Sequence, residues 1–233
     1  MLISILVPVF NEERTIKKIL EKISKLEFWL EDQGLKKEII IIDDGSFDDT
    51  KKILEENKSL YSKLILNKKN YGKGFSIKKG LEIAKGDYIL IQDADDEYDP
   101  SDYIKFIECA KKFKADLVVG SRFVYDKYTR SHNFFNKVGN NFITLIFNLL
   151  YNTTFTDIYS CYIFFKRELI NPIKLKTLGF DQHAEILCKL IKNGSKFYEV
   201  PINYNGRTIK EGKKIRFYHI FSIIFQMLKN RFV

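Results

Sequence analysis

The chain has 233 residues, of which 45% are hydrophobic and 30% charged, and this fits one large α/β domain or one domain with a C-terminal appendage. Its net charge of +9 favours acidic partners, namely nucleic acid, an anionic membrane surface or a phosphorylated substrate. Its three cysteines, Cys109, Cys161 and Cys188, are odd in number and lack close pair spacing, so neither a zinc site nor a disulfide framework is indicated and a reducing cytosol is expected. Because no basic segment precedes the first apolar run and no stretch reaches ~18 uninterrupted apolar residues, we expect neither a signal peptide nor a spanning helix.

Short apolar runs alternate with helical patterns in the first half of the chain. We predict strands at residues 2–7, 38–42, 63–66, 87–91 and 116–119. Apolar residues at helical spacing lie between them, at 14–30, 49–60, 75–84 and 100–113, with Asp48 or Asp49 suited to cap the second helix and a turn at 72–74. Strands that alternate with helices imply an α/β fold with a mostly parallel sheet and right-handed crossovers.

The second half of the chain is more apolar. Residues 133–151 are too apolar all round for an ordinary surface helix and must bury against something. A strand at 161–165, a helix at 182–192 and a strand at 196–200 follow. From residue 213 onward, apolar residues at helical spacing have basic residues at both ends, so this amphipathic helix is suited to a membrane interface; packing against the domain or a second subunit is the alternative. We therefore divide the chain into residues 1–212 and 213–233.

Acidic residues follow three of the predicted strands. Asn11-Glu12-Glu13 follows the first, Asp43-Asp44 the second and Asp93-Ala94-Asp95-Asp96-Glu97 the fourth. Because parallel strands end at one edge of a sheet, these acids should meet where a nucleotide binds at the switch in strand order. Clustered carboxylates repel one another and call for a compensating cation, and hard oxygen ligands suit Mg²⁺ or Mn²⁺, commonly shared with a phosphate. The convergence predicts a metal-bound phosphorylated ligand, whereas the last of these acidic runs taken alone also fits a solvated loop.

The sequence lacks the motifs that are typical of several other enzyme classes. Gly72-Lys73-Gly74 lacks the Gly-Lys-Ser/Thr ending of a P-loop, and no Gly-x-Gly-x-x-Gly follows the first strand. The histidines, His132, His183 and His219, lie far from any nucleophile-elbow pattern. A nucleic-acid partner is not expected, because acids gather where a basic groove would be needed.

Several short motifs stand in a fixed order along the chain. They are Val7-Pro8-Val9-Phe10-Asn11-Glu12, Asp43-Asp44-Gly45-Ser46, Gly72-Lys73-Gly74, Asp93-Ala94-Asp95 and Gly120-Ser121-Arg122. This set resembles the family 2 inverting glycosyltransferases of the GT-A fold. Further motifs are Thr156-Asp157-Ile158-Tyr159-Ser160, Val200-Pro201-Ile202, and Arg207 with Glu211-Gly212-Lys213-Lys214. These are similar to the dolichol-phosphate mannose synthase and polyprenyl-phosphate glucosyltransferase branch.

The resemblance implies a reaction and its partners. The enzyme would move a hexose, with inversion, from a GDP- or UDP-hexose to a membrane lipid, most simply a polyprenyl (dolichyl) phosphate. It would work with Mn²⁺ or Mg²⁺ as a peripheral protein at the cytoplasmic face of a membrane. A transferase of the same fold that acts on a glycolipid or soluble sugar hydroxyl is the alternative, and a catalytically silent nucleotide-sugar binder is a third.

The resemblance also implies roles for residues on the donor side. Pro8, Phe10, Glu12 and Asp44 fall where such enzymes hold the base and ribose, Lys73 falls near the nucleotide, and Asp93 and Ala94 fall beside the nucleotide or sugar. Asp95 and Glu97 would hold the divalent cation on the diphosphate, where it stabilises the charge that develops on the leaving group. Glu97 stands where several relatives have glutamine.

Acceptor-side roles are implied for basic residues and one acid. Arg122, Arg207 and Lys213 match residues that meet acceptor or donor phosphates, with Lys214 nearly equivalent to Lys213. Asp157 is either the base that deprotonates an acceptor hydroxyl or a positioning residue for an acceptor phosphate, which needs no base. Cys161 stands where the family usually has glycine, which would narrow the acceptor pocket.

Overall fold

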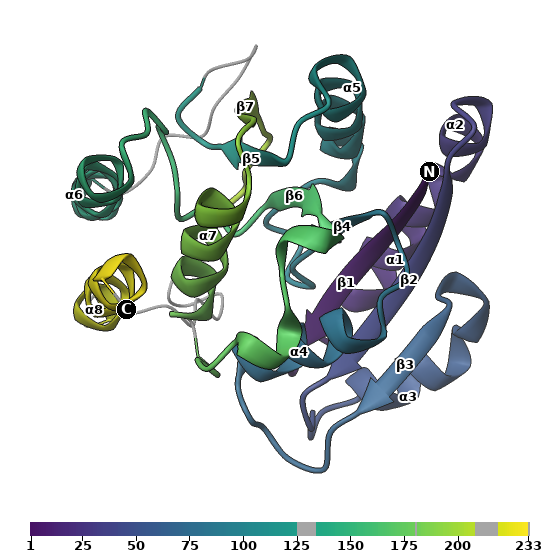
Figure 1. The fold of residues 1–233 in the computed structure, drawn as a ribbon. Coiled ribbons are helices and arrows are strands. Elements are labelled where there is room, and N and C mark those ends of the chain that lie inside the picture. Colours follow the sequence, from purple (N-terminus) through teal and green to yellow (C-terminus); the bar gives the residue numbers. More distant parts are fainter. Residues whose placement is uncertain (125–133, 180, 208–218, 233) are drawn as a thin grey trace.

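Residues 1–124, 134–179, 181–207 and 219–232 are described by the computed structural model drawn in Figure 1. Their strands are β1 (Leu2–Val9), β2 (Lys36–Asp43), β3 (Lys63–Leu66), β4 (Tyr88–Ile91), β5 (Leu117–Ser121), β6 (Ile163–Lys166) and β7 (Phe197–Pro201). Within the described residues these strands form one sheet in the order β3-β2-β1-β4-β6-β5-β7. In this sheet β6 is antiparallel to its neighbours β4 and β5, and the other pairs are parallel. The predicted α/β fold with a mostly parallel sheet is confirmed.

Both faces of the sheet are covered, which explains why its strands are apolar along most of their length. Successive side chains of a strand point to opposite faces. In β1, Ile5 and Val7 belong to one hydrophobic core cluster, whereas Leu6 between them belongs to the other. Each fully buried side chain of this size contributes about 1.5–3 kcal/mol, so the two clusters hold the layers together.

Helices form a layer on each face of the sheet (Figure 1). The first cluster receives side chains from α1 (Ile16–Lys25), α2 (Glu27–Asp32), α3 (Thr50–Glu56) and α5 (Tyr103–Phe113). The second receives them from α4 (Lys73–Ile83), α6 (Phe134–Tyr151), α7 (Gln182–Asn193) and α8 (His219–Phe232). Short 3-10 helices lie at Lys58–Leu60, Pro100–Asp102, Arg167–Leu169 and Pro172–Lys174.

Two predicted helices are wrong in their extent. The helix predicted over 14–30 is split into α1 and α2, because the Leu26 N–H bonds to the carbonyl of Ile23 and closes α1 with a tighter turn. The helix predicted over 49–60 ends at Glu56 and is followed by a 3-10 turn. Its N-cap residue is Asp49, but the side chain that bonds to the first turn is that of Asp48, which accepts from the Thr50 N–H at 3.0 Å.

The predicted turn at 72–74 and the predicted start of β6 are also wrong. Helix α4 begins at Lys73, with Gly72 as its N-cap at a φ of +102°, which favours glycine. Gly74 lies inside the helix, where an added Cβ would stand 2.6 Å from the carbonyl carbon of Leu178. Strand β6 begins at Ile163 because Cys161 adopts a φ of +63°, which interrupts the extended chain.

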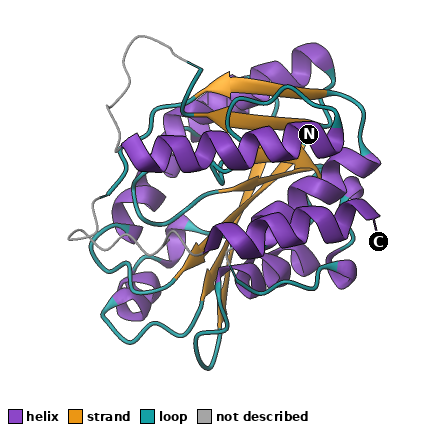
Figure 2. Cartoon of the chain, turned by 90° about the vertical axis from the view of Figure 1, so that its left-hand side faces the viewer, coloured by secondary structure: helices purple, strands orange, loops and turns teal. Residues whose placement is uncertain are grey.

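Helices α6 and α8 lie side by side and cross the front of Figure 2, and α8 also packs on α7. Phe147 of α6 and Met227 of α8 are fully buried between the helices and the sheet, and the Tyr151 hydroxyl donates to the Met227 carbonyl at 3.0 Å. Large apolar side chains on the outer faces stay exposed: Phe134, Phe135, Val138, Phe142, Leu145 and Leu149 of α6, and Phe221, Phe225, Leu228 and Phe232 of α8. None of the described helices combines the length and the hydropathy that crossing a bilayer requires.

Candidate functional site

A cavity of about 420 Å³ opens where the strand order reverses, between the carboxyl ends of β1 and β4. One half is polar and is formed by residues that follow these two strands, by the start of α4 and by the segment after β7. The other half is formed by α6, α8 and the chain before β6. Because β6 is antiparallel, the residues before it reach the same edge of the sheet as the residues after β4 and β5. This edge therefore gathers side chains from elements that lie far apart in the sequence.

The predicted site residues largely meet here. The cavity is lined by Pro8, Phe10, Glu12, Asp44, Lys73, Asp93, Ala94, Asp95, Glu97, Arg122 and Arg207. Asp157 is fully buried behind Arg122. Asp96 points away and pairs with Lys18 and Lys22 of α1, at 2.5 and 2.8 Å. Lys213 and Lys214 lie outside the described residues, as does the predicted boundary between residues 212 and 213.

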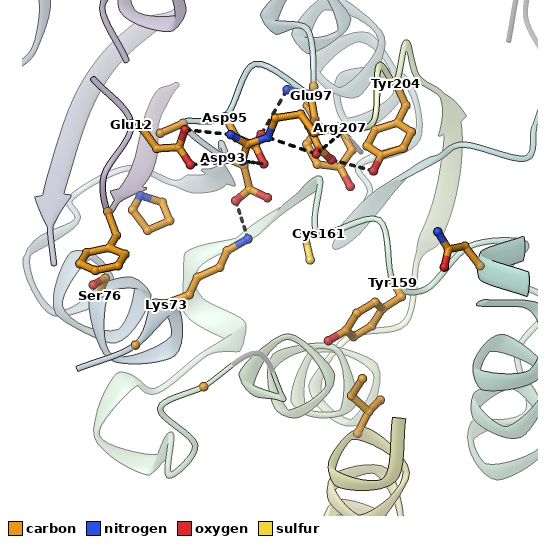
Figure 3. A pocket seen from close by; sticks show the side chains of 18 of the residues that line it. Glu12, Lys73, Ser76, Asp93, Asp95, Glu97, Tyr159, Cys161, Tyr204 and Arg207 are labelled. Carbon is orange, nitrogen blue, oxygen red and sulfur yellow. Dashed lines mark hydrogen bonds and ion pairs between the residues drawn. The ribbon is translucent and has the colours of Figure 1, made fainter. Parts of the chain in front are cut away.

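Arg207 is the centre of the acidic cluster (Figure 3). Its Nη1 and Nη2 donate to the two carboxylate oxygens of Glu12 at 3.1 and 3.2 Å, and Nη2 also donates to Asp95 at 3.1 Å. Its backbone N–H donates to Glu97 at 2.8 Å, with Nε of the same residue at 3.4 Å from that oxygen. One guanidinium thus joins carboxylates that come from two strand ends. Glu12, which the resemblance assigned to base or ribose, lies here in the acidic cluster.

The cluster keeps an excess of negative charge in spite of Arg207. Burial, together with the nearby carboxylates of Asp93 and Glu97, raises the pKa of Asp95 to about 7. Asp93 itself pairs with Lys73 of α4, whose Nζ lies 2.5 Å from its Oδ1 (Figure 3). Although burial opposes it, this pairing raises the pKa of Lys73. The carboxylate side of the cavity is therefore suited to a further cation.

A divalent cation fits the chemistry of these oxygens but not their present arrangement. Carboxylate oxygens are the ligands that Mg²⁺ and Mn²⁺ prefer. Among the described residues, however, no three His, Cys, Asp or Glu side chains are grouped so that they could hold a metal ion. The oxygens of Glu12, Asp95 and Glu97 are directed at the guanidinium instead. Asp95 and Glu97 would hold a cation only after Arg207 had moved.

Arg122 and Asp157 form a buried ion pair at the cavity wall. The Arg122 Nε and Nη2 donate to the two Asp157 oxygens at 2.7 and 2.8 Å, and the Arg122 backbone N–H donates at 3.0 Å. Both carboxylate oxygens are therefore engaged. The guanidinium also stacks on Tyr204, with its central carbon 5.1 Å from the ring centroid. Tyr204 in turn donates to Glu97 at 2.7 Å, so it links this pair to the acidic cluster.

Asp44 and Phe10, two of the predicted nucleotide residues, also line the polar half. Asp44 accepts hydrogen bonds from the Gly72 N–H at 2.7 Å, the Tyr71 N–H at 3.1 Å and the Asn67 amide at 2.8 Å. Its carboxylate thus fixes the chain that leads into α4. The Phe10 ring packs edge-on against Phe47, with centroids 5.9 Å apart. This part of the cavity has an apolar wall and a fixed loop.

Some lining residues were not assigned a site role from the sequence. Tyr204 carries no motif, and its role depends on a hydrogen bond from its hydroxyl to Glu97, which lies 107 residues away in the sequence. Tyr159 and Cys161 stand between the polar half and α8 (Figure 3). Cys161, which by the resemblance would narrow the acceptor pocket, is buried, and this burial raises the pKa of its thiol to about 11. His183 is buried, and its Nε2 lies 2.8 Å from the Ile158 carbonyl oxygen.

Known proteins resemble this chain in sequence and in structure. The model of glycosyl transferase family 2 matches residues 4–173. A dolichol-phosphate mannosyltransferase from Pyrococcus furiosus is 28% identical over 216 residues, which cover 91% of this chain and 59% of that protein. Glycosyltransferase AglJ from Haloferax volcanii is 28% identical over 206 residues, which cover 88% of this chain and 63% of that one. This chain therefore spans about six-tenths of the length of these two relatives.

Solved structures show the same fold. Glucosyl-3-phosphoglycerate synthase from Mycobacterium tuberculosis, in complex with Mn²⁺, UDP and phosphoglyceric acid, superposes with a TM-score of 0.70 at 18% identity, covering 99% of this chain and 78% of that one. TarS from S. aureus in complex with UDP-GlcNAc superposes with a TM-score of 0.63 at 16% identity, covering all of this chain and 68% of that one. With the family model matching nearly three-quarters of its length, the chain belongs to glycosyl transferase family 2 and has the GT-A fold of these enzymes.

Proposed function

We propose that this glycosyltransferase moves a hexose, with inversion, from a nucleoside-diphosphate sugar to a membrane lipid that carries a phosphate, such as a polyprenyl phosphate. The observation that supports this most directly is the division of the cavity. Its polar half holds acidic and basic groups at the switch in strand order, and its other half is walled by Ile143, Ile220 and Ile223 of α6 and α8. A charged donor and an apolar acceptor thus each find a matching surface.

The donor belongs in the polar half. Glycosyltransferase neighbours of known structure contain UDP or UDP-GlcNAc, and one contains Mn²⁺ as well. Pro8 and Phe10 would contact the base, while Lys73 and Arg207 supply positive charge for phosphate oxygens. Asp95 and Glu97 would hold a divalent cation, which stabilises charge on the leaving diphosphate. Asp44 would act through the loop that it fixes.

The acceptor side favours a phosphate over a hydroxyl. A hydroxyl acceptor needs a base within reach of its proton. Asp157 is fully buried, and both its oxygens accept hydrogen bonds from Arg122. It therefore acts as a positioning residue that holds Arg122 at the cavity wall. A lipid phosphate already bears the negative charge of a nucleophile, and an arginine fork suits it. The mannosyltransferase of P. furiosus is named for such an acceptor.

The acceptor would be reached at a membrane surface. The outer faces of α6 and α8 expose aromatic and aliphatic side chains, and neither helix contains an aspartate or glutamate. We propose that this surface lies against the lipid headgroups as a peripheral contact at the cytoplasmic side, with residues 213–233 as the amphipathic C-terminal segment.

A donor screen tests the proposal. We expect either UDP-hexoses or GDP-hexoses to raise the melting temperature in the presence of Mn²⁺, because a ligand at about 100 times its dissociation constant stabilises by ~2.7 kcal/mol. The same donor should then label a polyprenyl phosphate and not the corresponding polyprenol. The Asp95→Ala variant should lose the transfer. Stabilisation by none of the UDP-, GDP- or dTDP-sugars, or equal transfer to the alcohol, would contradict the proposal.

A further inference from the structure

Arg207 occupies the position at which the acidic oxygens of the cavity converge. It contacts Glu12, Asp95 and Glu97 through its side chain, and these contacts lie between 3.1 and 3.4 Å (Figure 3). The three carboxylates come from the ends of β1 and β4, which are neighbours in the sheet. The singly charged guanidinium of Arg207, which belongs to the segment after β7, thus occupies the position in which Asp95 and Glu97 would hold a metal ion.

Arg207 neutralises the negative charge of the acidic cluster only in part. Three formal negative charges face one guanidinium, and the fourth carboxylate, Asp93, is already paired with Lys73. A divalent cation would compensate the same oxygens better. It would also leave the partly buried guanidinium of Arg207 without its carboxylate partners, which is unfavourable. Arg207 can therefore leave the carboxylates cheaply only if another anion receives it.

We propose that Arg207 holds the cation position in the free enzyme and gives it up only when a diphosphate enters, so that the cation binds with the donor and not before it. On donor binding, Arg207 exchanges carboxylate oxygens for phosphate oxygens, and the carboxylates become available to the cation. This inference rests on the proposed function. It makes the binding of donor and cation positively coupled. The diphosphate draws Arg207 away from the carboxylates that the cation needs, and the cation takes the carboxylates that hold Arg207 away from the diphosphate.

The neighbouring contacts allow the guanidinium to move without the chain that carries it. Tyr204 donates to the second oxygen of Glu97 at 2.7 Å, and the Asn205 N–H donates to the Glu97 carbonyl at 2.9 Å. The Arg207 backbone N–H is bound to Glu97 as well. These bonds hold residues 204–207 against the loop after β4. The exchange thus needs only new side-chain torsions in Arg207.

The test measures Mn²⁺ binding to the full chain without any nucleotide, by the loss of the free-ion signal in electron paramagnetic resonance. Arg207→Gln should bind Mn²⁺ roughly tenfold more tightly than the wild-type protein, which corresponds to about 1.4 kcal/mol. Arg207→Lys should fall between the two, since an ammonium lacks the fork that bridges two carboxylates. General damage to the fold would weaken Mn²⁺ binding, which is the opposite sign.

The matched control is Lys22→Gln. Lys22 pairs with Asp96 and Asp99 in the same acidic loop, outside the cavity, so its loss changes the net charge equally. It should leave the Mn²⁺ affinity within about twofold of the wild-type value, as expected for a charge exposed to screening by salt. Equal affinities of wild type and Arg207→Gln would overturn the inference. An equal gain in Lys22→Gln would also overturn it, because net charge alone would then explain the effect.

A second arm adds UDP or GDP. In the wild-type protein the nucleotide should tighten Mn²⁺ binding by at least tenfold, and in Arg207→Gln by less, because the competitor is already gone. If neither nucleotide changes the Mn²⁺ affinity of either protein, the proposed donor fails. The comparison made with Mn²⁺ alone still decides whether Arg207 competes for the cation. An equal effect of nucleotide on both proteins would overturn the exchange.

Discussion

Asp157 and Arg122 are the most deeply buried charged pair of the described site. Asp157 is fully buried, Arg122 is nearly so, and three hydrogen bonds of 2.7–3.0 Å join them. Removing one partner of such a pair leaves a charge that is neither hydrated nor compensated. Its structural importance is therefore testable without any substrate.

We expect Asp157→Asn to lower the free energy of unfolding by about 3–5 kcal/mol, measured by urea denaturation at pH 7. The control is Glu55→Gln, which removes a charge from the exposed pair of Lys51 and Glu55, 3.8 Å apart on α3. An exposed pair contributes at most about 1 kcal/mol. A stability of Asp157→Asn within 1 kcal/mol of the wild-type value would contradict the structural role.

At the level of single residues, the sequence predicted the acids better than their partners. Glu12, Asp44 and Asp95 follow apolar runs, and a parallel sheet brings such strand ends together. Arg207, by contrast, lies 195 residues from Glu12, and no local pattern indicates that it would bond to it. The pairing of Arg122 with Asp157 depends on the direction of β6, which no periodicity encodes.

At the level of elements, the strands were predicted because burial on both faces makes them apolar throughout. The errors lie where local geometry overrides spacing. Apolar spacing continues through Leu26 although α1 ends there, and the glycines of 72–74 suggest a turn although only Gly72 has a positive φ. Residue 74 is glycine because a side chain there would clash with Leu178, and only the tertiary structure reveals this close contact.

Asp116 joins three elements through its carboxylate. It lies just before β5 and accepts hydrogen bonds from Lys166 of β6 at 2.7 Å and from the N–H groups of Ser195 and Lys196 before β7, at 2.8 and 3.1 Å. Burial alone would raise its pKa, but these bonds lower the pKa of Asp116 to about 2. Since this value lies below that of an unfolded chain, about 3.9, the ionised carboxylate stabilises the fold above pH 4.

Asp116→Asn should therefore lower the free energy of unfolding by about 2 kcal/mol at pH 7, the usual range for hydrogen bonds to a charged group. The difference from wild type should shrink as the pH falls from 5 toward 2, because the wild-type carboxylate then takes up a proton. Urea denaturation at several pH values measures it. The exposed Asp32→Asn serves as the control and should show little difference at any pH. A pH-independent difference for Asp116→Asn would contradict the linkage.

At the level of the whole molecule, α8 has two different faces. Ile223 and Met227 are buried in the second core cluster, so deleting the helix would open that core. Phe221 and Phe225 point outward and are 71% and 60% exposed. Together with the outer face of α6 they make an apolar surface whose charged residues within the two helices are Lys137, Lys229 and Arg231. Apolar side chains with basic neighbours suit an anionic bilayer.

The double substitution Phe221→Glu and Phe225→Glu tests the membrane contact while leaving the buried face of α8 intact. We expect the wild-type protein to float with vesicles of anionic phospholipid and the variant to bind at least tenfold more weakly, because each phenylalanine contributes about 1.5–3 kcal/mol when buried. Ile173→Glu is the matched control, since Ile173 is 81% exposed and lies outside both helices. If the surface instead met a second copy of the chain, the double variant would change the molecular mass in sedimentation and leave flotation unaltered. Equal flotation of all three proteins would remove this surface from the membrane proposal.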